Sequence, residues 1–178
     1  AQLACQAYND YYHTQFHTLG DIIRNVHREK WQDLLHQFQL IPENNTVPNL
    51  LYDRFRQFVI ETDYIIPQAV HNLRNNKLTQ FGDLIDLSHI ASRQLLGNII
   101  PEIDFLQQRA RELGAIAASG FGAGFGGSVY AITKSSFAEA FLAMWQDEYF
   151  KQYPQLKKLT HWLTFRPDGA ARQIQGQS

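Results

Sequence analysis

Apolar residues in positions 1–113 recur mostly at spacings of three and four, the pattern of helices that bury one face. A loose stripe near the start and a sharper one over 19–38 predict two helices. Prolines and asparagines then predict a loop at 42–48. A long helix is predicted from Leu51 to Leu73. Pro67 lies inside it and lacks the N–H that would bond to residue 63, so we expect a kink there and not an end.

Two shorter helices complete this helical region. Apolar positions from Leu78 to Leu96 predict the first, which closes near Gly97. Pro101 stands at the first turn of the second, where a helix does not need its N–H, and acidic residues follow it. The apolar stripe of this helix continues towards Gly114, which is a suitable C-terminal cap.

After Gly114 the pattern changes to short β-prone runs separated by turn residues. The runs Ala115–Ser119 and Val129–Ile132 predict a hairpin with a wide, glycine-rich connection. The spacing Ser136-x-x-Glu139 predicts a capping box, which opens a helix rich in aromatic residues.

The end of the chain predicts further β structure. Apolar and polar residues alternate over 159–165, which predicts a strand, and 170–174 predicts a last short strand after a turn. Helices followed by the order β, β, α, β predict an α+β fold, with an antiparallel sheet backed by helices. We interpret residues 1–178 as a single domain with a helical region (1–113) and a hairpin and β-β-α-β region (114–174).

The stretch Ser119–Val129, SGFGAGFGGSV, holds five of the chain's eleven glycines. Such density disfavours an ordinary strand or helix, because each glycine loses much backbone freedom on folding and adds no side chain to a core. Glycine is needed where a backbone turns through positive φ or crosses another backbone closely, or where N–H groups approach a bulky anion such as phosphate. The residues alone leave a phosphate cradle and a purely architectural crossing equally open.

Two well-known motifs fit these letters but not their context. Gly122, Gly124 and Gly127 spell G-x-G-x-x-G, yet the dinucleotide-binding fold needs a helix to open directly from the loop, and a β-prone run follows here. Val129 completes G-x-G-x-x-G-x-V, the glycine-rich loop of protein kinases. No H-R-D or D-F-G element occurs in the chain, which argues against that class.

Charge and composition limit the classes of partner and the location that we predict for the chain. A formal net charge of -1, from 16 basic and 17 acidic residues, gives no general attraction for nucleic acid or anionic lipid, so we predict neither as a partner. No apolar run approaches the roughly 20 residues that span a bilayer. One cysteine permits no internal disulfide, which favours a reducing, cytoplasmic location. The chain starts at Ala1 without Met, which suggests a fragment or a processed form of a longer protein.

Other residues with catalytic or metal-binding chemistry are isolated. His13 and His17 are spaced i, i+4 but lack H-E-x-x-H or a carboxylate cluster, so we interpret them as a solvated face and predict no metal site. His89 is a lone histidine on a partly apolar helix, which favours a satisfied structural role over a site role. No serine stands in G-x-S-x-G, and the one cysteine lies at the chain start, so no catalytic residue is assigned.

The chain contains FGDLIDLSH, PEIDFL, GAGFGGSV and FRP with GA, in this order. Together these motifs resemble the C-terminal half of the GHMP kinases, and galactokinases most closely. GAGFGGSV at Gly122–Val129 looks like the third glycine-rich motif of that superfamily, and FGDLIDLSH at Phe81–His89 looks like the galactokinase helix that carries Ser-His. PEIDFL at Pro101–Leu106 resembles the Pro-Glu-Leu-Asp that opens the next helix. FRP with GA, within 165–170, is similar to the closing strand. The resemblance extends from about Arg54 to Arg172.

This resemblance implies a ferredoxin-like layer of strands and helices, with extra N-terminal helices in this chain. It also implies that the glycine-rich loop lines a cleft for ATP and a sugar, galactose or a related one. The cofactor-binding candidates are then Gly122, Gly124, Gly126, Gly127 and Ser128. ATP and Mg²⁺ would be cofactors of the intact enzyme, held together with an N-terminal kinase lobe, and we expect neither to be held tightly by this chain alone.

The motifs of the family's N-terminal half do not occur in this chain: the P-x-x-x-G-L-S-S-S-A phosphate loop, the Gly-Glu-His sugar segment and the catalytic Asp. We therefore expect the chain alone to be inactive as a kinase. The chain also departs from the galactokinase pattern at two positions. Phe121 stands where galactokinases usually carry Thr, and Ser119 stands where they often carry Arg. The alternative interpretation is a stand-alone, non-catalytic α+β module that binds a ligand or a partner.

Overall fold

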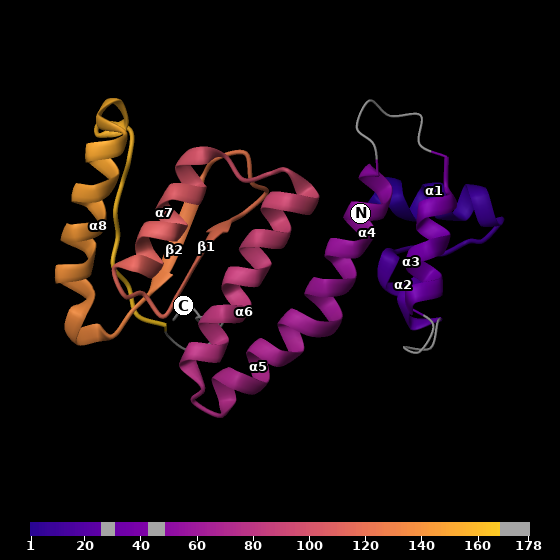
Figure 1. Ribbon diagram of the computed structural model, residues 1–178, viewed down its shortest axis with the longest axis horizontal. Helices are drawn as coiled ribbons and strands as arrows, with labels where there is room; N and C mark the ends of the chain where they lie inside the picture. The colour runs from indigo at the N-terminus through magenta and orange to yellow at the C-terminus, as the bar shows by residue number, and fades with distance from the viewer. Residues whose placement is uncertain (26–30, 43–48, 168–178) are drawn as a thin grey trace, which may run out of the picture.

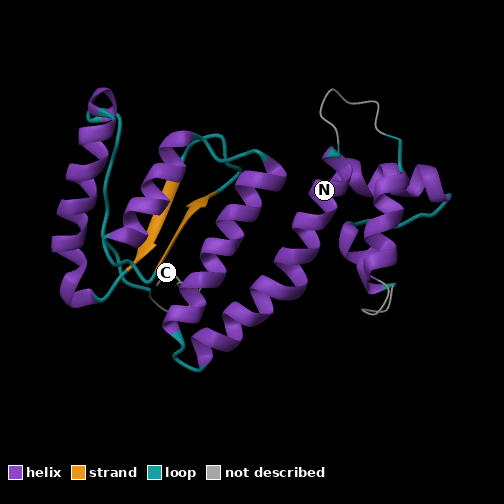
Figure 2. Ribbon diagram, viewed as in Figure 1, coloured by secondary structure: helices purple, strands orange, loops and turns teal. Residues whose placement is uncertain are grey.

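The computed structural model describes residues 1–25, 31–42 and 49–167, and it is an α+β structure made mostly of helices (Figures 1 and 2). The elements, in chain order, are α1 (Gln2–Tyr12), α2 (Leu19–Arg24), α3 (Trp31–Leu40), α4 (Leu50–Val59), the π-helical stretch η2 (Ile60–Ile65), α5 (Ile66–Arg74), α6 (Leu78–Ala91), the π-helical stretch η3 (Ser92–Leu96), α7 (Pro101–Glu112), β1 (Ala117–Phe121), β2 (Ser128–Ile132), the 3₁₀ turn η4 (Ser135–Phe137), α8 (Ala138–Gln152) and the 3₁₀ turn η5 (Pro154–Leu156). No helix in the described ranges is both long and apolar enough to cross a membrane.

The N-terminal region contains three helices where the periodicity predicted two. The stripe over 19–38 is divided between α2 and α3, on either side of residues that the structure does not describe. The break before α2 has a local cause, because α1 ends at His13 in the left-handed conformation. Thr18 then forms a capping box with Asp21, which starts α2. The loop predicted at 42–48 falls mostly outside the described residues.

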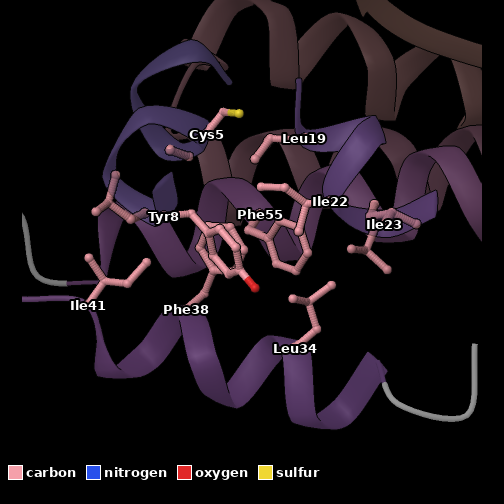
Figure 3. Close-up of a cluster of buried hydrophobic side chains, with 12 residues drawn as sticks. Cys5, Tyr8, Leu19, Ile22, Ile23, Leu34, Phe38, Ile41 and Phe55 are labelled. Atoms are coloured by element: carbon pink, nitrogen blue, oxygen red, sulfur yellow. The ribbon is translucent and has the colours of Figure 1, made fainter. Parts of the chain in front are cut away.

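These helices pack around α4 and form a core of their own (Figure 3). The rings of Phe38 and Phe55 stack with centroids 3.8 Å apart, and both side chains are fully buried. Tyr8 stacks on Phe38 and donates its hydroxyl hydrogen to Gln37 at 2.8 Å. Burial of this aromatic area anchors the first helices on α4.

The long helix through Pro67 is continuous, as predicted, from α4 through η2 to α5. The irregularity lies before the proline: η2 is π-helical, and the Ile66 N–H bonds to the carbonyl of Glu61, five residues earlier. Pro67 has no N–H for residue 63, so the regular ladder is interrupted where the π-helical stretch occurs. The helix therefore adjusts its turn and does not end.

The two helices predicted next are also present. α6 continues through η3 and ends at Gly97, which is left-handed with φ of 60°. α7 begins at Pro101, carries Glu102 and Asp104 in its first turn, and is followed by left-handed Gly114. Each end therefore has the residue that its backbone requires.

The predicted hairpin is confirmed, with strand bounds that differ by a residue or two. β1 and β2 pair antiparallel, with Ser119 opposite Tyr130 and Phe121 opposite Ser128. α6 lies beside β1 and α7 packs against both strands, while α8 packs against α7 (Figure 1). Gly82 of α6 lies so close to the carbonyl of Ile116 that a Cβ there would collide with it. The start of the hairpin is thus pressed onto α6.

A second core joins α7, α8 and the hairpin. Its buried members are Leu106, Ala110, Ala115, Ala118, Phe141, Trp145 and Tyr149. Trp145 also donates its indole N–H to the carbonyl of Leu106, at 2.9 Å. This core fixes the hairpin on α7, and the hairpin connection projects from it.

Two predictions near the end of the chain are wrong. The Ser136 capping box is not formed, because residues 135–137 make a 3₁₀ turn and α8 starts with Phe137 as its N-cap. The strand predicted over 159–165 is coil: Trp162 packs its ring edge-on against Trp145 of α8, with centroids 5.1 Å apart, and the segment makes no sheet pairing with the hairpin. The last predicted strand, 170–174, lies outside the described residues.

Candidate functional site

The glycine-rich connection between β1 and β2 turns repeatedly through the left-handed region. Positive φ angles occur at Gly122 (97°), Gly124 (84°), Phe125 (60°), Gly126 (120°) and Gly127 (98°). Residues with a Cβ rarely adopt such angles, so the glycine density has a backbone cause. We call residues 122–127 the glycine loop.

Asn98, in the connection between η3 and α7, crosses this loop. Its backbone carbonyl accepts the Phe125 N–H at 2.6 Å, and its side-chain Nδ2 donates to the Ala123 carbonyl at 3.2 Å. A Cβ on Gly124 would lie 2.5 Å from the Asn98 carbonyl oxygen and 2.6 Å from its Nδ2. At Gly124, therefore, glycine is needed for the close crossing of two backbones, because Asn98 leaves no space for any side chain.

The other glycines of the loop are open. A Cβ on Gly122 would meet no atom within 4 Å, and one on Gly126 would meet only the Ile100 side chain at 3.7 Å. The N–H groups of Gly122, Gly124, Gly126 and Gly127 donate no hydrogen bond to any part of the chain that the structure describes. Successive free N–H groups, which occur here at Gly126 and Gly127, are what an anion-binding concavity requires. The phosphate reading thus stays a prediction that the geometry permits.

Two hollows border the loop. A small one of about 40 Å³ lies between the loop and the η3–α7 connection, and its lining includes Asn98, Ile103 and Gly120. A larger one of about 520 Å³ is mainly apolar and lies between the loop, α1 and α4, with Phe125 in its lining. The small hollow has room for little more than water, whereas the larger has the size of a ligand pocket.

Two aromatic side chains at the loop are largely exposed. Phe121 and Phe125 expose 66% and 73% of their surface. Ser128, the remaining predicted site residue, opens β2 opposite Phe121 and is exposed. The structure therefore brings all five predicted site residues into one loop and the first position after it.

The structure shows where three of the histidines lie. His13 and His17 are both exposed. His89 is buried and hydrogen-bonded, as expected of a satisfied histidine. Its second partner, the N–H of Gly120, lies at the base of the glycine loop.

Asn98 is the residue of this site that sequence reasoning missed. Its position directly after the helix-ending Gly97 is visible in the sequence, and asparagine is common at such turns. Nothing in the local pattern indicates that it meets a loop 25 residues later. Only the packing of α6 and α7 on β1 brings the two together.

Comparison with known proteins confirms the resemblance to GHMP kinases. The family model described as "GHMP kinases C terminal" matches residues 69–152, from within α5 to the last residue of α8, and so includes the glycine loop. The galactokinase of Levilactobacillus brevis is 30% identical over 132 residues, 65% of this chain and 34% of that protein. The galactokinase of Thermosipho africanus is 29% identical over 98 residues, 54% of this chain and 28% of that protein.

A solved structure shows the same fold. The crystal structure of Lactococcus lactis galactokinase complexed with galactose aligns with 84% of this chain and 35% of its own, with a TM-score of 0.65 and 22% sequence identity. This chain spans about a third of the length of the curated relatives it matches. These comparisons support a resemblance to the C-terminal domain of the GHMP kinases, galactokinases among them, and an α+β fold.

The crossing at Asn98 predicts unequal effects of alanine within the loop. Gly122→Ala and Gly124→Ala both place a Cβ at positive φ, which costs about 1 kcal/mol. Gly124→Ala must in addition displace the Asn98 backbone, and overpacking of this kind costs a further 1–3 kcal/mol or so. Urea unfolding of the 178-residue chain measures both losses. Equal losses would show that the crossing yields easily and does not fix the loop.

Proposed function

We propose that this chain is the C-terminal lobe of a galactokinase-like, ATP-dependent sugar kinase, and that the glycine loop closes the cleft for ATP and sugar. The observation that carries this proposal is the set of free N–H groups on the glycine loop. They belong to residues that are exposed (Gly122 and Gly127) or half-buried (Gly124 and Gly126), beside a crossing that holds the loop in one place. The galactokinase relatives and the family match supply the reaction class.

The chemistry of phosphoryl transfer fits such a division of labour. ATP supplies the phosphoryl group, and catalysis consists mostly of positioning and of stabilising the charge on its oxygens. Backbone N–H donors of Gly122, Gly126 and Gly127 are suited to that task, because they are already oriented and carry no side chain that would block a phosphate. Gly124 serves the same loop by making the Asn98 crossing possible.

The remaining parts of the active site are assigned to an N-terminal lobe. Mg²⁺ is usually held by one or two carboxylates together with the phosphates of the nucleotide, and we propose that the protein ligands of the ion come from that lobe. We likewise assign no catalytic base here. The galactose or related sugar would meet the loop from the side of that lobe, where Phe121 and Phe125 are exposed.

The first prediction concerns the chain by itself. The purified 178-residue protein should show no ATP-dependent phosphorylation of galactose, measured as ADP release above a no-sugar blank. The same assay on the complete protein, with an N-terminal lobe, should show turnover. Turnover by the isolated chain that is lost on substituting one of its own residues would contradict the division proposed here.

A second prediction separates the loop's binding role from its backbone strain. Gly122 and Gly114 have nearly equal φ angles, 97° and 95°, and a Cβ at either meets no atom within 4 Å, but Gly114 lies between α7 and β1. Both alanine variants should lose about 1 kcal/mol of unfolding free energy. In the complete protein only Gly122→Ala should lower kcat/KM for ATP, by roughly tenfold or more if a phosphate contact is lost.

Gly126→Ala extends this comparison, because its Cβ would approach only Ile100. It should behave like Gly122→Ala. A complete protein in which both loop variants keep the rate of the Gly114→Ala control would show that the glycine loop does not contact the phosphates.

A further inference from the structure

His89 connects the packing of the helices to the base of the glycine loop. Its side chain is 2% exposed. Nε2 lies 3.2 Å from Oδ1 of Asp104 on α7, and Nδ1 accepts the backbone N–H of Gly120 on β1 at 3.4 Å. A backbone N–H can only donate, so Nδ1 carries no hydrogen and the ring hydrogen is on Nε2, which donates to Asp104. The ring is therefore neutral and held in one tautomer by two elements.

Asp104 is itself fixed from two further sides. Arg93 of η3 donates to both of its carboxylate oxygens, at 3.1 and 2.8 Å, and Gln108 donates to Oδ2 at 3.0 Å. An ion-paired carboxylate with these partners orients the imidazole in the way that a buried carboxylate commonly orients a histidine. The position of the His89 ring thus depends on η3 and α7 together.

Gly120 is the other end of this connection. It is paired with Val129 in the hairpin and stands two residues before Gly122, where the glycine loop begins. It has no room for a side chain, since a Cβ would lie 2.9 Å from Cγ2 of Ile103. The N–H that His89 accepts is consequently part of the backbone from which the loop departs.

We propose that His89 is a positioning residue for the glycine loop: in its neutral form it holds the Gly120 backbone, and protonation of Nδ1 releases that hold. The imidazolium would place an N–H against the Gly120 N–H, two donors facing each other with no acceptor between them. The loop base would then move away from the ring. For catalysis this inference rests on the function proposed above, but its effect on the loop can be measured without any substrate.

The charges around the ring set the direction of the effect. Burial lowers the pKa of His89, against the opposing influence of the hydrogen-bonded Asp104. Arg93 of η3 also lowers the pKa and Asp86 of α6 raises it, while β1 contributes no titratable side chain. Because folding lowers the pKa of His89, the neutral ring makes its full contribution to the free energy of unfolding above pH 6.5, the pKa of histidine in the unfolded chain. This contribution falls as the pH decreases below 6.5.

Two substitutions of His89 each keep one of the ring's two hydrogen bonds and remove the other. His89→Asn places an oxygen near the position of Nδ1 and can still accept the Gly120 N–H without titrating. His89→Gln places an amide N–H near the position of Nε2, so it can still donate to Asp104 but does not hold Gly120. His71→Gln, at an exposed position of α5, is the matched control.

The experiment is amide hydrogen exchange and amide NMR of the 178-residue chain between about pH 5 and pH 8, with protection factors corrected for the intrinsic pH dependence. In the unmodified chain the amide resonances of Gly120 and of the glycine loop should follow one titration with a midpoint below 6.5. Protection of the two hydrogen-bonded amides there, Gly120 and Phe125, should fall about tenfold across it. His89→Asn should abolish the titration and keep the protection. His89→Gln should show the low-pH protection at every pH.

The inference is overturned if the loop amides do not titrate, or if His89→Asn and His89→Gln change loop protection equally, because His89 would then be a packing residue only. The titration of the unmodified chain decides the matter even if a variant fails to fold. Kinase assays of the complete protein keep the two proposals apart. Loop coupling without kinase activity would remove the proposed function and leave this inference standing.

Discussion

The backbone at Asn98 crosses the glycine loop so closely that residue 124 has no space for a side chain. The conformation of the loop is therefore set by the position of the η3–α7 connection. That position depends in turn on the ion pair of Arg93 with Asp104 and on the contact of α6 with the start of β1 at Gly82. The glycine loop, whose sequence is intrinsically flexible, is thereby held by helices and strands. A preorganised binding loop requires this arrangement.

Within the described residues the buried apolar side chains form three clusters, and the hairpin that carries the loop packs in one of them. The core of α7, α8 and the hairpin falls within the segment that matches the GHMP kinase family, residues 69–152. The core of α1–α4 lies before that segment and borders the loop across the larger hollow, whose lining includes Phe125 and residues of α1 and α4. α4 also packs against η3, which leads into the Asn98 crossing, so the N-terminal helices support the element that holds the loop.

Much of this architecture follows from local signals. Periodicity predicted the helices around Pro67, Gly97 and Pro101 because each has one apolar face and the end residue that its backbone needs. Alternation over 159–165 failed as a strand signal, because Trp162 is partly buried against α8 by aromatic packing without a strand partner. Alternating apolar and polar residues are compatible with a paired strand and with a coil that packs through its aromatic side chains. Only the contact of Trp162 with α8 decides between the two.

In the candidate site, too, local features could be predicted from the sequence and long-range contacts could not. Glycine density predicted positive φ angles, because glycine is nearly the only residue that tolerates them. The partners that hold the loop, Asn98 and His89, could not be assigned, since each acts through a hydrogen bond to a segment 25 or more residues away. Sequence reasoning gave His89 a structural role, and the structure adds that its second bond reaches the loop base.

The central claim is that the glycine loop closes on ATP in the complete protein. The most direct measurement is amide hydrogen exchange of residues 122–127 in that protein, with and without galactose, Mg²⁺ and a non-hydrolysable ATP analogue. The account predicts that the ligands slow exchange of the loop amides by about tenfold or more, while α1–α3 are unchanged. A protein that phosphorylates galactose, yet whose loop amides exchange equally with and without saturating ligands, would contradict it.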